Sequence, residues 1–316
     1  MVYSALLIRK RVGFGSCIFM SIVGALLLLS ACSQATSSMP ALRGHLLIEG
    51  STALQPLTSA AASIFEKRFP QVHIEVNGGG SLLGLDAVSK QEADIGESDV
   101  YADPALYPDP DLMDHIVCII PFTLISHPDV PVSTLTQQQI LDIFVTGKLR
   151  NWDQLGGADL PIVPVVRSDT SGTRASFLKY VLNGESERKH LLQADSSLTM
   201  LHLVAQTPGA IGYMGLSSLD PSVHTLAMNG ITATPKAIAS GQYPFWGYEH
   251  MYTLSNHHNP VITAFLQFML SSTIQEQARQ MGYISLEQVQ LPTPGSGVQE
   301  NSSTKATEAF LQERRY

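Results

Sequence analysis

The amino-acid sequence predicts an α/β protein with mostly parallel sheets. Short apolar segments that end in Gly or polar residues alternate with amphipathic helical segments, beginning with an expected strand over 45–49 and an expected helix over 54–69. The chain has 316 residues, 44% hydrophobic and 15% charged, so it has a globular composition and the length of about two domains. Because parallel strands of such folds end at one edge of the sheet, a ligand is expected there.

The same alternation continues along the chain. A strand over 73–77, a short helix over 82–91 and a strand over 93–96 complete a first unit, and a long apolar strand over 116–126 leaves it. In the second half the expected helices are 137–144, 174–182 and 261–281, and the expected strands are 162–167, 210–214, 225–228 and 251–254. A tail rich in Pro, Gly and Ser, residues 291–316, is predicted to be flexible.

The N-terminal segment predicts export from the cytoplasm. Residues 9–11, Arg-Lys-Arg, precede a mostly apolar run over 12–29, as in the n-region and h-region of a secretory signal. The run is long enough for a transmembrane helix, but small polar residues without a cluster of charges follow it. An uncleaved membrane anchor is the alternative, and in both cases the body of the chain lies outside the cytoplasm.

The end of this run is similar to a bacterial lipobox. Residues 29–32 read Leu-Ser-Ala-Cys, and in such a motif the Cys thiol receives a diacylglyceryl group while the chain is cut just before it. We therefore expect residues 1–31 to be a lipoprotein signal peptide, Cys32 to be the lipid attachment and residues 32–40 to be a linker. The protein would then be held on the periplasmic or cell-surface side of the membrane by its lipid anchor only.

Charge and cysteine content exclude several classes of protein. The net charge is −8, and removal of the three basic residues of the signal leaves −11, so no nucleic-acid groove is expected. Cys17 leaves with the signal and Cys32 carries lipid, so Cys118 is the one thiol expected in the body and an internal disulfide is excluded. The apolar run 115–126 around Cys118 favours an inert buried thiol over a catalytic nucleophile.

Three strand-to-helix junctions share one design that suits an oxyanion. They are residues 49–52 (Glu-Gly-Ser-Thr), 77–81 (Asn-Gly-Gly-Gly-Ser) and 167–174 (Arg-Ser-Asp-Thr-Ser-Gly-Thr-Arg). Each offers Gly for close approach of the backbone, a hydroxyl group and the free amides of a helix N-terminus. Plain helix capping is the alternative for each, and Thr52 with Gln55 has capping-box spacing. Three such junctions in one chain favour a shared site for a tetrahedral anion.

Charged side chains refine this prediction. Arg167 can hold two oxygens of an oxyanion with its planar guanidinium, although a surface ion pair is the alternative. Asp99 follows the expected strand 93–96, and a carboxylate beside an anion is unfavourable unless the ligand has a proton to donate to it. Hydrogen phosphate has such a proton and sulfate does not, so Asp99 would select hydrogen phosphate. The alternative role for Asp99 is that of an N-cap in a loop. Arg174 lies in the first turn of its helix, where a cation opposes the helix dipole, so either a nearby anion offsets that cost or the side chain points to solvent.

These motifs resemble those of the phosphate-binding proteins of ABC importers. In order along the chain they are Gly50-Ser51-Thr52, Gly78-Gly79-Gly80-Ser81, Ala93-Asp94-Ile95-Gly96 with Ser98-Asp99, Arg167 with Ser171-Gly172-Thr173-Arg174, and Gly209-Ala210-Ile211-Gly212-Tyr213. The resemblance covers about residues 45–285 and implies a two-lobed type II periplasmic-binding-protein fold with two hinge crossovers. It implies that lobe 1 combines 41–123 with 244–290, that lobe 2 takes 124–243, and that the lobes close on one hydrogen phosphate ion.

The phosphate contacts of the family are carried over at matching positions. The resemblance implies that Asp99 accepts the phosphate proton and that Arg167 clamps the phosphate oxygens. The other phosphate-binding residues it implies are Ser51, Thr52, Ala53, Ser81, Ser171, Gly172 and Thr173. Two departures from the family pattern are Glu97, which would add negative charge on the side of Asp99, and Leu82-Leu83 after the loop serine.

The expected function is that of an extracytoplasmic solute-binding lipoprotein. As a monomer it would capture phosphate and deliver it to the permease and ATPase subunits of an ABC importer. No enzymatic reaction, cofactor or metal is expected, because residues 256–259 (Asn-His-His-Asn) lack metal-ligand spacing and no Gly-x-Ser-x-Gly elbow surrounds Ser171. A phosphate or oxyanion sensor, a protein for another tetrahedral oxyanion and a secreted phosphoester hydrolase are the alternatives.

Overall fold

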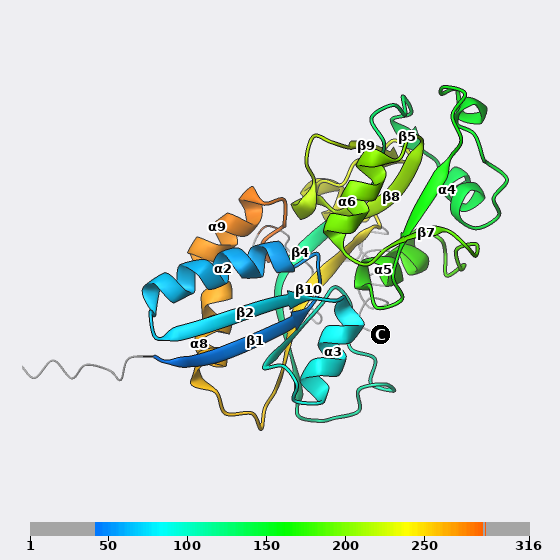
Figure 1. Cartoon of the computed structure of the whole chain (residues 1–316). Coiled ribbons are helices and arrows are strands. Elements are labelled where there is room, and N and C mark those ends of the chain that lie inside the picture. Colours follow the sequence, from blue (N-terminus) through cyan, green and yellow to red (C-terminus); the bar gives the residue numbers. More distant parts are fainter. Residues whose placement is uncertain (1–41, 287, 289–316) are drawn as a thin grey trace, which may run out of the picture. The chain divides into compact units, whose positions relative to one another are not determined.

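The computed structural model describes residues 42–286 and 288, and Figure 1 shows the arrangement of their helices and strands. The predicted signal peptide, the linker and the tail 291–316 lie outside these residues. The strands are β1 (Gly44–Gly50), β2 (Val72–Gly78), β3 (Ile95–Ser98), β4 (Leu112–Ser126), β5 (Thr134–Leu135), β6 (Val163–Arg167), β7 (Leu192–Ala194), β8 (Ala210–Gly215), β9 (His224–Met228) and β10 (Trp246–Leu254). The α-helices are α2 (Gln55–Arg68), α3 (Ser81–Ser89), α4 (Gln137–Phe144), α5 (Gly172–Tyr180), α6 (Ser197–Gln206), α7 (Pro235–Ala239), α8 (Pro260–Met269) and α9 (Ser272–Gln280), and two 3₁₀ turns cover Trp152–Leu155 and Leu216–Ser218.

One path of paired strands runs through the structure in the order β2-β1-β3-β10-β4-β8-β6-β7, and β9 pairs with β4 and β5. We call β2, β1 and β3 the first sheet part and β8, β6 and β7 the second sheet part. The strands within each part are parallel, as predicted. The two strands between them are antiparallel to their neighbours, because β4 carries the chain from the first part to the second and β10 carries it back (Figure 1). The expectation of mostly parallel sheets is therefore wrong at the centre, and the fold is mixed α/β.

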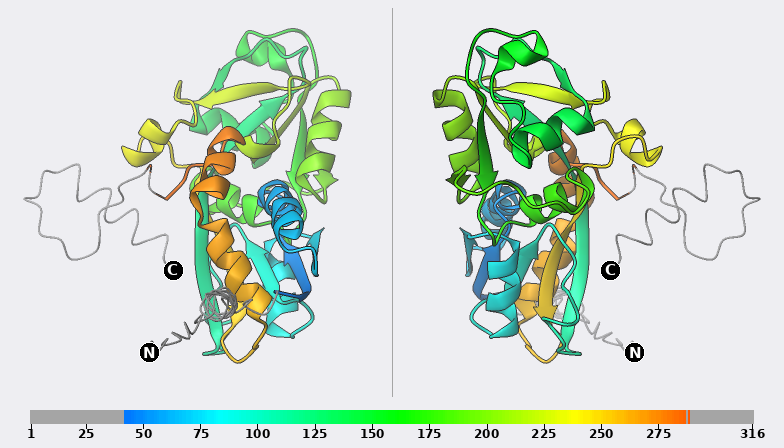
Figure 2. Two further views of the ribbon diagram at one scale, coloured as in Figure 1. Left: turned by 90° about the vertical axis from the view of Figure 1, so that its left-hand side faces the viewer. Right: turned by 90° about the vertical axis from the view of Figure 1, so that its right-hand side faces the viewer.

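The first sheet part is covered by helices on both faces. On one face α2 packs beside α8 (Figure 2), and Phe65 of α2 contacts the rings of Phe265 and Phe268. On the other face Leu85 of α3 belongs to an apolar cluster with Tyr252 of β10. Because apolar side chains cover both faces, the polar groups of this part gather where its strands end.

The sequence prediction is wrong at one helix and incomplete at others. The helix expected over 261–281 is two helices, because Ser271 adopts an extended conformation (φ −68°, ψ 153°) that ends α8 and begins α9. Helices α6 and α7 and the short strands β5 and β7 are not predicted. The capping box expected at Thr52 and Gln55 does not form, since α2 has Leu54 as its N-cap without a side-chain hydrogen bond.

No helix among the described residues is long and apolar enough to cross a membrane.

Candidate functional site

The three predicted junctions meet at one place in the structure. The glycine-rich loop before α3 contacts the loop before α5, where the Leu82 amide donates to the Thr170 carbonyl at 3.0 Å. The Thr170 hydroxyl donates in turn to the Gly79 carbonyl at 2.8 Å. Because these loops follow β2 and β6, the contact joins the ends of the two sheet parts.

Asp99 lies where three of these segments converge. Its Oδ1 accepts a hydrogen bond from the Ser51 hydroxyl, and its Oδ2 accepts one from the Thr173 hydroxyl at 2.7 Å. Its backbone amide donates to the Ser81 hydroxyl at 2.9 Å. The residue is only 4% exposed, so its carboxylate depends on these hydroxyls for solvation. The loop N-cap interpretation is wrong here, because both carboxylate oxygens accept from side chains and neither from an amide.

Arg167 approaches the same place from the end of β6. It is 1% exposed, and its Nη2 donates to the Thr52 hydroxyl at 2.9 Å, which links the two sheet parts. Its Nε is buried without a hydrogen-bond partner among the described residues. Burial lowers the pKa of Arg167, while the charge of Asp99 acts in the opposite direction. Such a buried guanidinium with a spare N–H group excludes the alternative of an exposed surface ion pair.

The N-terminus of α5 forms another side of the site. The Ser171 hydroxyl caps this helix by accepting from the Arg174 amide at 3.2 Å. Gly172 allows close approach of the two sheet parts, because a Cβ there would lie 2.3 Å from Ser81 Oγ and 3.0 Å from Asp99 Cβ. Any side chain at Gly172 would push the two parts away from each other.

Two backbone amides at the N-terminus of α2 already donate hydrogen bonds within the protein. The amides of Ala53 and Leu54 both donate to Ser51 Oγ at 3.0 Å. The Ala53 carbonyl accepts from Ser217 at 3.2 Å and from Tyr283 at 2.5 Å. All nine predicted binding residues are therefore brought together, but Ala53 takes part through its backbone alone.

Ser197 is a member of the site that the sequence prediction does not contain. It begins α6, its amide donates to Thr52 Oγ1 at 3.2 Å, and its hydroxyl lies 3.2 Å from the same atom. Arg167 Nη1 also donates to the Ser197 hydroxyl at 3.5 Å. The signal available in the sequence is the pair Ser196-Ser197 before a helical segment, in which Ser196 caps α6 by accepting from the Thr199 amide.

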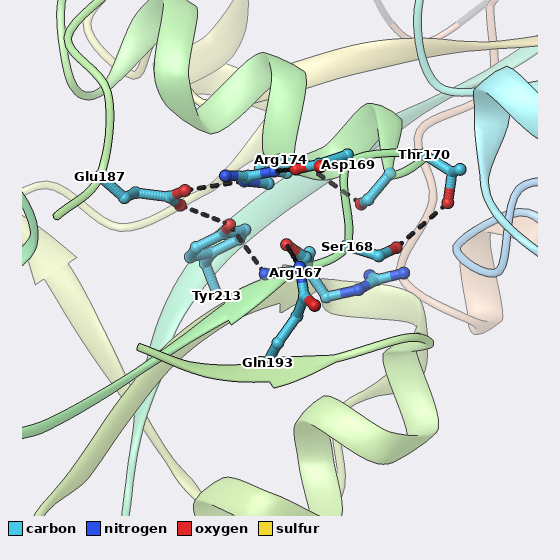
Figure 3. A network of polar contacts seen from close by, with 9 residues as sticks. Arg167, Ser168, Asp169, Thr170, Arg174, Glu187, Gln193 and Tyr213 are labelled. Atoms are coloured by element: carbon cyan, nitrogen blue, oxygen red, sulfur yellow. Dashed lines mark hydrogen bonds and ion pairs between the residues drawn. The ribbon is translucent and has the colours of Figure 1, made fainter. Parts of the chain in front are cut away.

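Arg174 belongs to a supporting network rather than to the site. Figure 3 shows its guanidinium between Glu187 and Asp169, with a distance of 2.7 Å from Nε to Glu187 Oε2. The Tyr213 hydroxyl donates to Glu187 Oε1 at 2.9 Å and accepts from the Arg167 amide at 3.2 Å (Figure 3). Of the two predicted alternatives for Arg174, a nearby anion is confirmed, because the carboxylates of Glu187 and Asp169 provide its counter-charge. The network fixes the end of β6 from which the Arg167 side chain extends.

Glu97 differs from its expected role. It is fully buried on β3, its Oε1 accepts a hydrogen bond from the Thr58 hydroxyl of α2, and burial raises its pKa to about 8. A carboxyl group with this pKa is neutral at pH 7. The expectation that Glu97 adds negative charge beside Asp99 is therefore wrong at neutral pH.

Two candidates for other chemistry lack the required surroundings. Cys118 is fully buried, and burial raises its pKa well above the usual value, as expected for an inert thiol. In the segment 256–259, His257 Nε2 lies 2.9 Å from Asp94. No group of three or more potential metal ligands occurs among residues 42–286 and 288.

A cavity of about 510 Å³ adjoins the polar cluster at Asp99. Its walls are formed by the segment after β3 (99–104), by α5 residues 175–180 and by β10 residues 246–250. The cavity therefore lies between the segment after β3, α5 and β10, the strand that returns the chain to the first part.

Comparison with known proteins agrees with this fold. A family model described as "PBP superfamily domain" matches residues 35–273. The Phosphate-binding protein PstS of Bacillus subtilis is 39% identical over 259 residues, which cover 81% of this chain and 85% of that protein.

Two solved structures extend the comparison. A candidate phosphate ABC transporter substrate-binding protein from Clostridium perfringens, with bound phosphate, has a TM-score of 0.72 and 30% identity, covering 77% of this chain and all of the other. An ABC-type phosphate transport receptor from Vibrio cholerae has a TM-score of 0.61 and 25% identity, covering 76% of this chain and 99% of the other.

The mixed α/β fold and the buried polar site at its strand ends define a binding protein of the PBP superfamily with a type II periplasmic-binding-protein fold. Within that superfamily, the chain belongs to the PstS family of phosphate-binding proteins.

Proposed function

We propose that this protein binds inorganic phosphate, as hydrogen phosphate, and delivers it to an ABC permease. Membership of the PstS family and the phosphate-bound relative support the ligand class. The single observation that carries the proposal is the convergence on Asp99 of the Ser51 and Thr173 hydroxyls, which come from opposite sheet parts. A buried carboxylate among neutral donors suits an anion that brings its own proton.

The proposed binding site uses neutral hydrogen-bond donors and one guanidinium. Arg167 supplies the positive charge, and its unpartnered Nε leaves a donor for a phosphate oxygen. Asp99 accepts the phosphate proton and repels fully ionised sulfate. The other proposed contacts are Ser51, Thr52, Ala53 through its amide, Ser81, Ser171, Gly172 and Thr173. Hydroxyl groups that now bind one another would rotate toward the anion, so binding exchanges hydrogen bonds rather than leaving any unmade.

The topology supports the proposal that phosphate is captured by closure of two lobes. Lobe 1 would combine 41–123 with 244–290, and lobe 2 would be 124–243, with β4 and the segment before β10 as the crossovers. A ligand that contacts both lobes favours the closed arrangement, because only that arrangement offers all of its partners at once. The protein would perform no chemistry on phosphate, and ATP hydrolysis would belong to a separate importer subunit.

The proposed location is the outer side of the cell membrane, on the periplasmic or cell-surface side. Cys32 would carry the lipid, and the linker 32–40 would give the monomeric body freedom to reach the permease.

Calorimetric titration of the full chain in mild detergent with phosphate and with sulfate tests the proposal. We expect phosphate binding at least about a hundredfold tighter than sulfate binding, which corresponds to a difference of about 2.7 kcal/mol. Binding of sulfate or another tetrahedral oxyanion without phosphate binding would support the alternative ligand and contradict the proposal. Release of phosphate from a phosphoester would instead indicate a hydrolase.

A further inference from the structure

Two buried glutamates lie behind the site on the face of the sheet covered by α2. Glu97 of β3 and Glu249 of β10 are both fully buried. In the pairing of β3 with β10, Glu97 lies opposite Met251 and Ser98 lies opposite His250. Asp99 and Glu249 are the next two positions in the same antiparallel register. Glu97 and Asp99 are two residues apart on an extended segment. The three carboxyl groups therefore form one cluster, which we call the carboxyl cluster.

Few hydrogen-bond donors contact the oxygen atoms of the two glutamates in the carboxyl cluster. Glu97 Oε2 and both oxygens of Glu249 are buried without a hydrogen-bond partner of good geometry among the described residues. Within that part of the chain no Lys or Arg forms an ion pair with either glutamate. Three ionised carboxylates so placed would repel one another without compensation. At least one proton must be shared among them.

Other groups around the carboxyl cluster do not supply positive charge. Cys118 of β4 and Tyr283 after α9 face the glutamates, and burial keeps the pKa of each well above its usual value, so both are neutral. From α2 the neighbour is the Thr58 hydroxyl, which donates to Glu97. Among residues 42–286 and 288, the one cation in electrostatic contact with the carboxyl cluster is Arg167, and it acts on Asp99. The positive charge of Arg167 therefore acts on Asp99 and does not compensate the two glutamates.

We propose that Glu97 and Glu249 hold protons behind Asp99, so that phosphate affinity depends on whether Glu97 keeps its proton. The inference rests on the proposed function, because it concerns the same anion. Glu97 acts through Asp99 and through the local potential, so it is a positioning residue and need not touch the ligand.

The titration behaviour of the two glutamates supports this assignment. Burial is the main cause that raises the pKa of Glu97 to about 8, and the charge of Asp99 raises it further, against the Thr58 hydrogen bond. Burial likewise raises the pKa of Glu249 well above the usual value, and Asp99 and Glu97 add to that effect. Glu97 is thus the member of the carboxyl cluster that loses its proton in mildly alkaline solution. A new negative charge beside Asp99 opposes the entry of an anion.

The test compares phosphate affinity between pH 6.5 and 9.5 in the full wild-type chain, in Glu97→Gln and in the control Glu92→Gln. Glu92 is exposed just before β3, so its substitution removes a carboxylate without entering the carboxyl cluster. The titration of phosphate itself affects all three proteins equally and cancels in their ratios. We expect the affinity of the wild type to fall relative to Glu97→Gln by about tenfold from pH 7 to pH 9, since pH 9 is about one unit above the pKa. Glu92→Gln should follow the wild type.

A second measurement on the phosphate-free wild type covers the case in which Glu97→Gln does not fold. Infrared spectra at pH 7 should contain the C=O stretch of buried protonated carboxyl groups, part of which should disappear with a midpoint near pH 8. Absence of that band at pH 7 would overturn the inference. A constant affinity ratio in a protein that binds phosphate would also overturn it, while leaving the proposed function intact. Failure of the wild type to bind phosphate at every pH, with the band present, would instead contradict the proposed function.

Discussion

The Thr173 hydroxyl donates a hydrogen bond of 2.7 Å to Asp99 across 74 residues of sequence. Thr173 lies in the first turn of α5, which follows β6 of the second sheet part, and Asp99 follows β3, the last strand of the first part. With Ser51 donating to the other carboxylate oxygen, both acceptors of Asp99 are used by hydroxyl groups. An anion that enters between these groups can therefore contact the Asp99 carboxylate only if the anion carries its own hydrogen-bond donor.

Replacement of Asp99 by Asn should relax the choice between anions. The amide keeps the shape of the side chain but cannot accept a ligand proton at both positions or repel sulfate. We expect the ratio of phosphate to sulfate affinity to fall roughly thirtyfold, the equivalent of about 2 kcal/mol for a hydrogen bond to a charged group. Calorimetric titration with both anions measures the ratio. An unchanged ratio in Asp99→Asn, matching that of the exposed control Asp153→Asn, would show that Asp99 does not select the ligand.

Replacement of Arg167 by Lys should weaken phosphate binding although the charge is kept. Lys lacks the planar fork and cannot replace both the contact with Thr52 and the free Nε–H group. Since disruption of a buried, hydrogen-bonded charge pair costs about 2–5 kcal/mol, the affinity should fall by at least about thirtyfold. The exposed substitution Arg43→Lys is the matched control. Equal affinities in the two variants would exclude a bidentate role for Arg167.

Much of the site could be predicted because its residues stand at strand ends. Parallel strands end at one edge, so a Gly or hydroxyl residue just after each apolar segment is placed near the others without knowledge of the packing. That argument brings Ser51 and Ser81 to one edge of the first sheet part, and the structure places them there. Ser171 follows β6 of the second sheet part and reaches them only because the loop before α5 contacts the loop before α3. The antiparallel strand β10 was missed as a central strand because only its end, 251–254, was recognised as apolar.

What could not be predicted depends on contacts between distant segments. Ser197 enters the site only because α6 begins beside Thr52, 145 residues earlier. The protonation of Glu97 follows from its burial under α2, where Thr58 lies 39 residues away in sequence. The break at Ser271 also escapes a pattern of apolar periodicity, because both helices keep their buried faces on either side of it. Apolar periodicity identifies the buried face of a helix but does not show where the helix axis changes direction.

Replacement of Gly172 by Ala should impair binding more than folding. The new Cβ would lie 2.3 Å from Ser81 Oγ, a contact made only where the two sheet parts meet. Overpacking of this kind costs roughly 1–3 kcal/mol, so phosphate affinity should fall by about tenfold or more. By contrast, Gly84→Ala would meet the Glu97 carbonyl within the first part at 2.7 Å and should lower the free energy of unfolding of the phosphate-free protein. Closure across Gly172 would be contradicted if Gly172→Ala lowered the free energy of unfolding without changing phosphate affinity, while Gly84→Ala weakened phosphate binding.

Replacement of Cys32 by Ala should abolish lipid attachment. Cells grown with labelled palmitate should incorporate label into the wild-type chain and not into Cys32→Ala, because the proposed thiol acceptor is absent. Cys118→Ala is the control, since that thiol is fully buried and should not affect labelling. Absence of label from the wild type would exclude the lipobox interpretation and favour an uncleaved anchor, whereas label retained in Cys32→Ala would place the lipid on another residue.

The free energy of unfolding of the phosphate-free protein should decrease as the pH rises from 5 to 8. The pKa of Glu97 is about 8 in the folded protein and near the ordinary 4.5 after unfolding, so between these values the folded state holds a proton that the unfolded state releases. The stabilisation is complete below pH 4.5 and is lost as the pH rises toward 8, with a slope of up to about 1.4 kcal/mol per pH unit.

Denaturant titrations followed by circular dichroism at several pH values measure this slope, and Glu97→Gln should reduce it by that amount. Glu249 acts in the same direction because its pKa is also raised, so a smaller slope should remain in Glu97→Gln and disappear in the double variant with Glu249→Gln. Equal slopes in the wild type and Glu97→Gln would mean that Glu97 is already ionised below pH 7. In that case its charge would lie permanently beside Asp99, and the site would have to bind its anion against it.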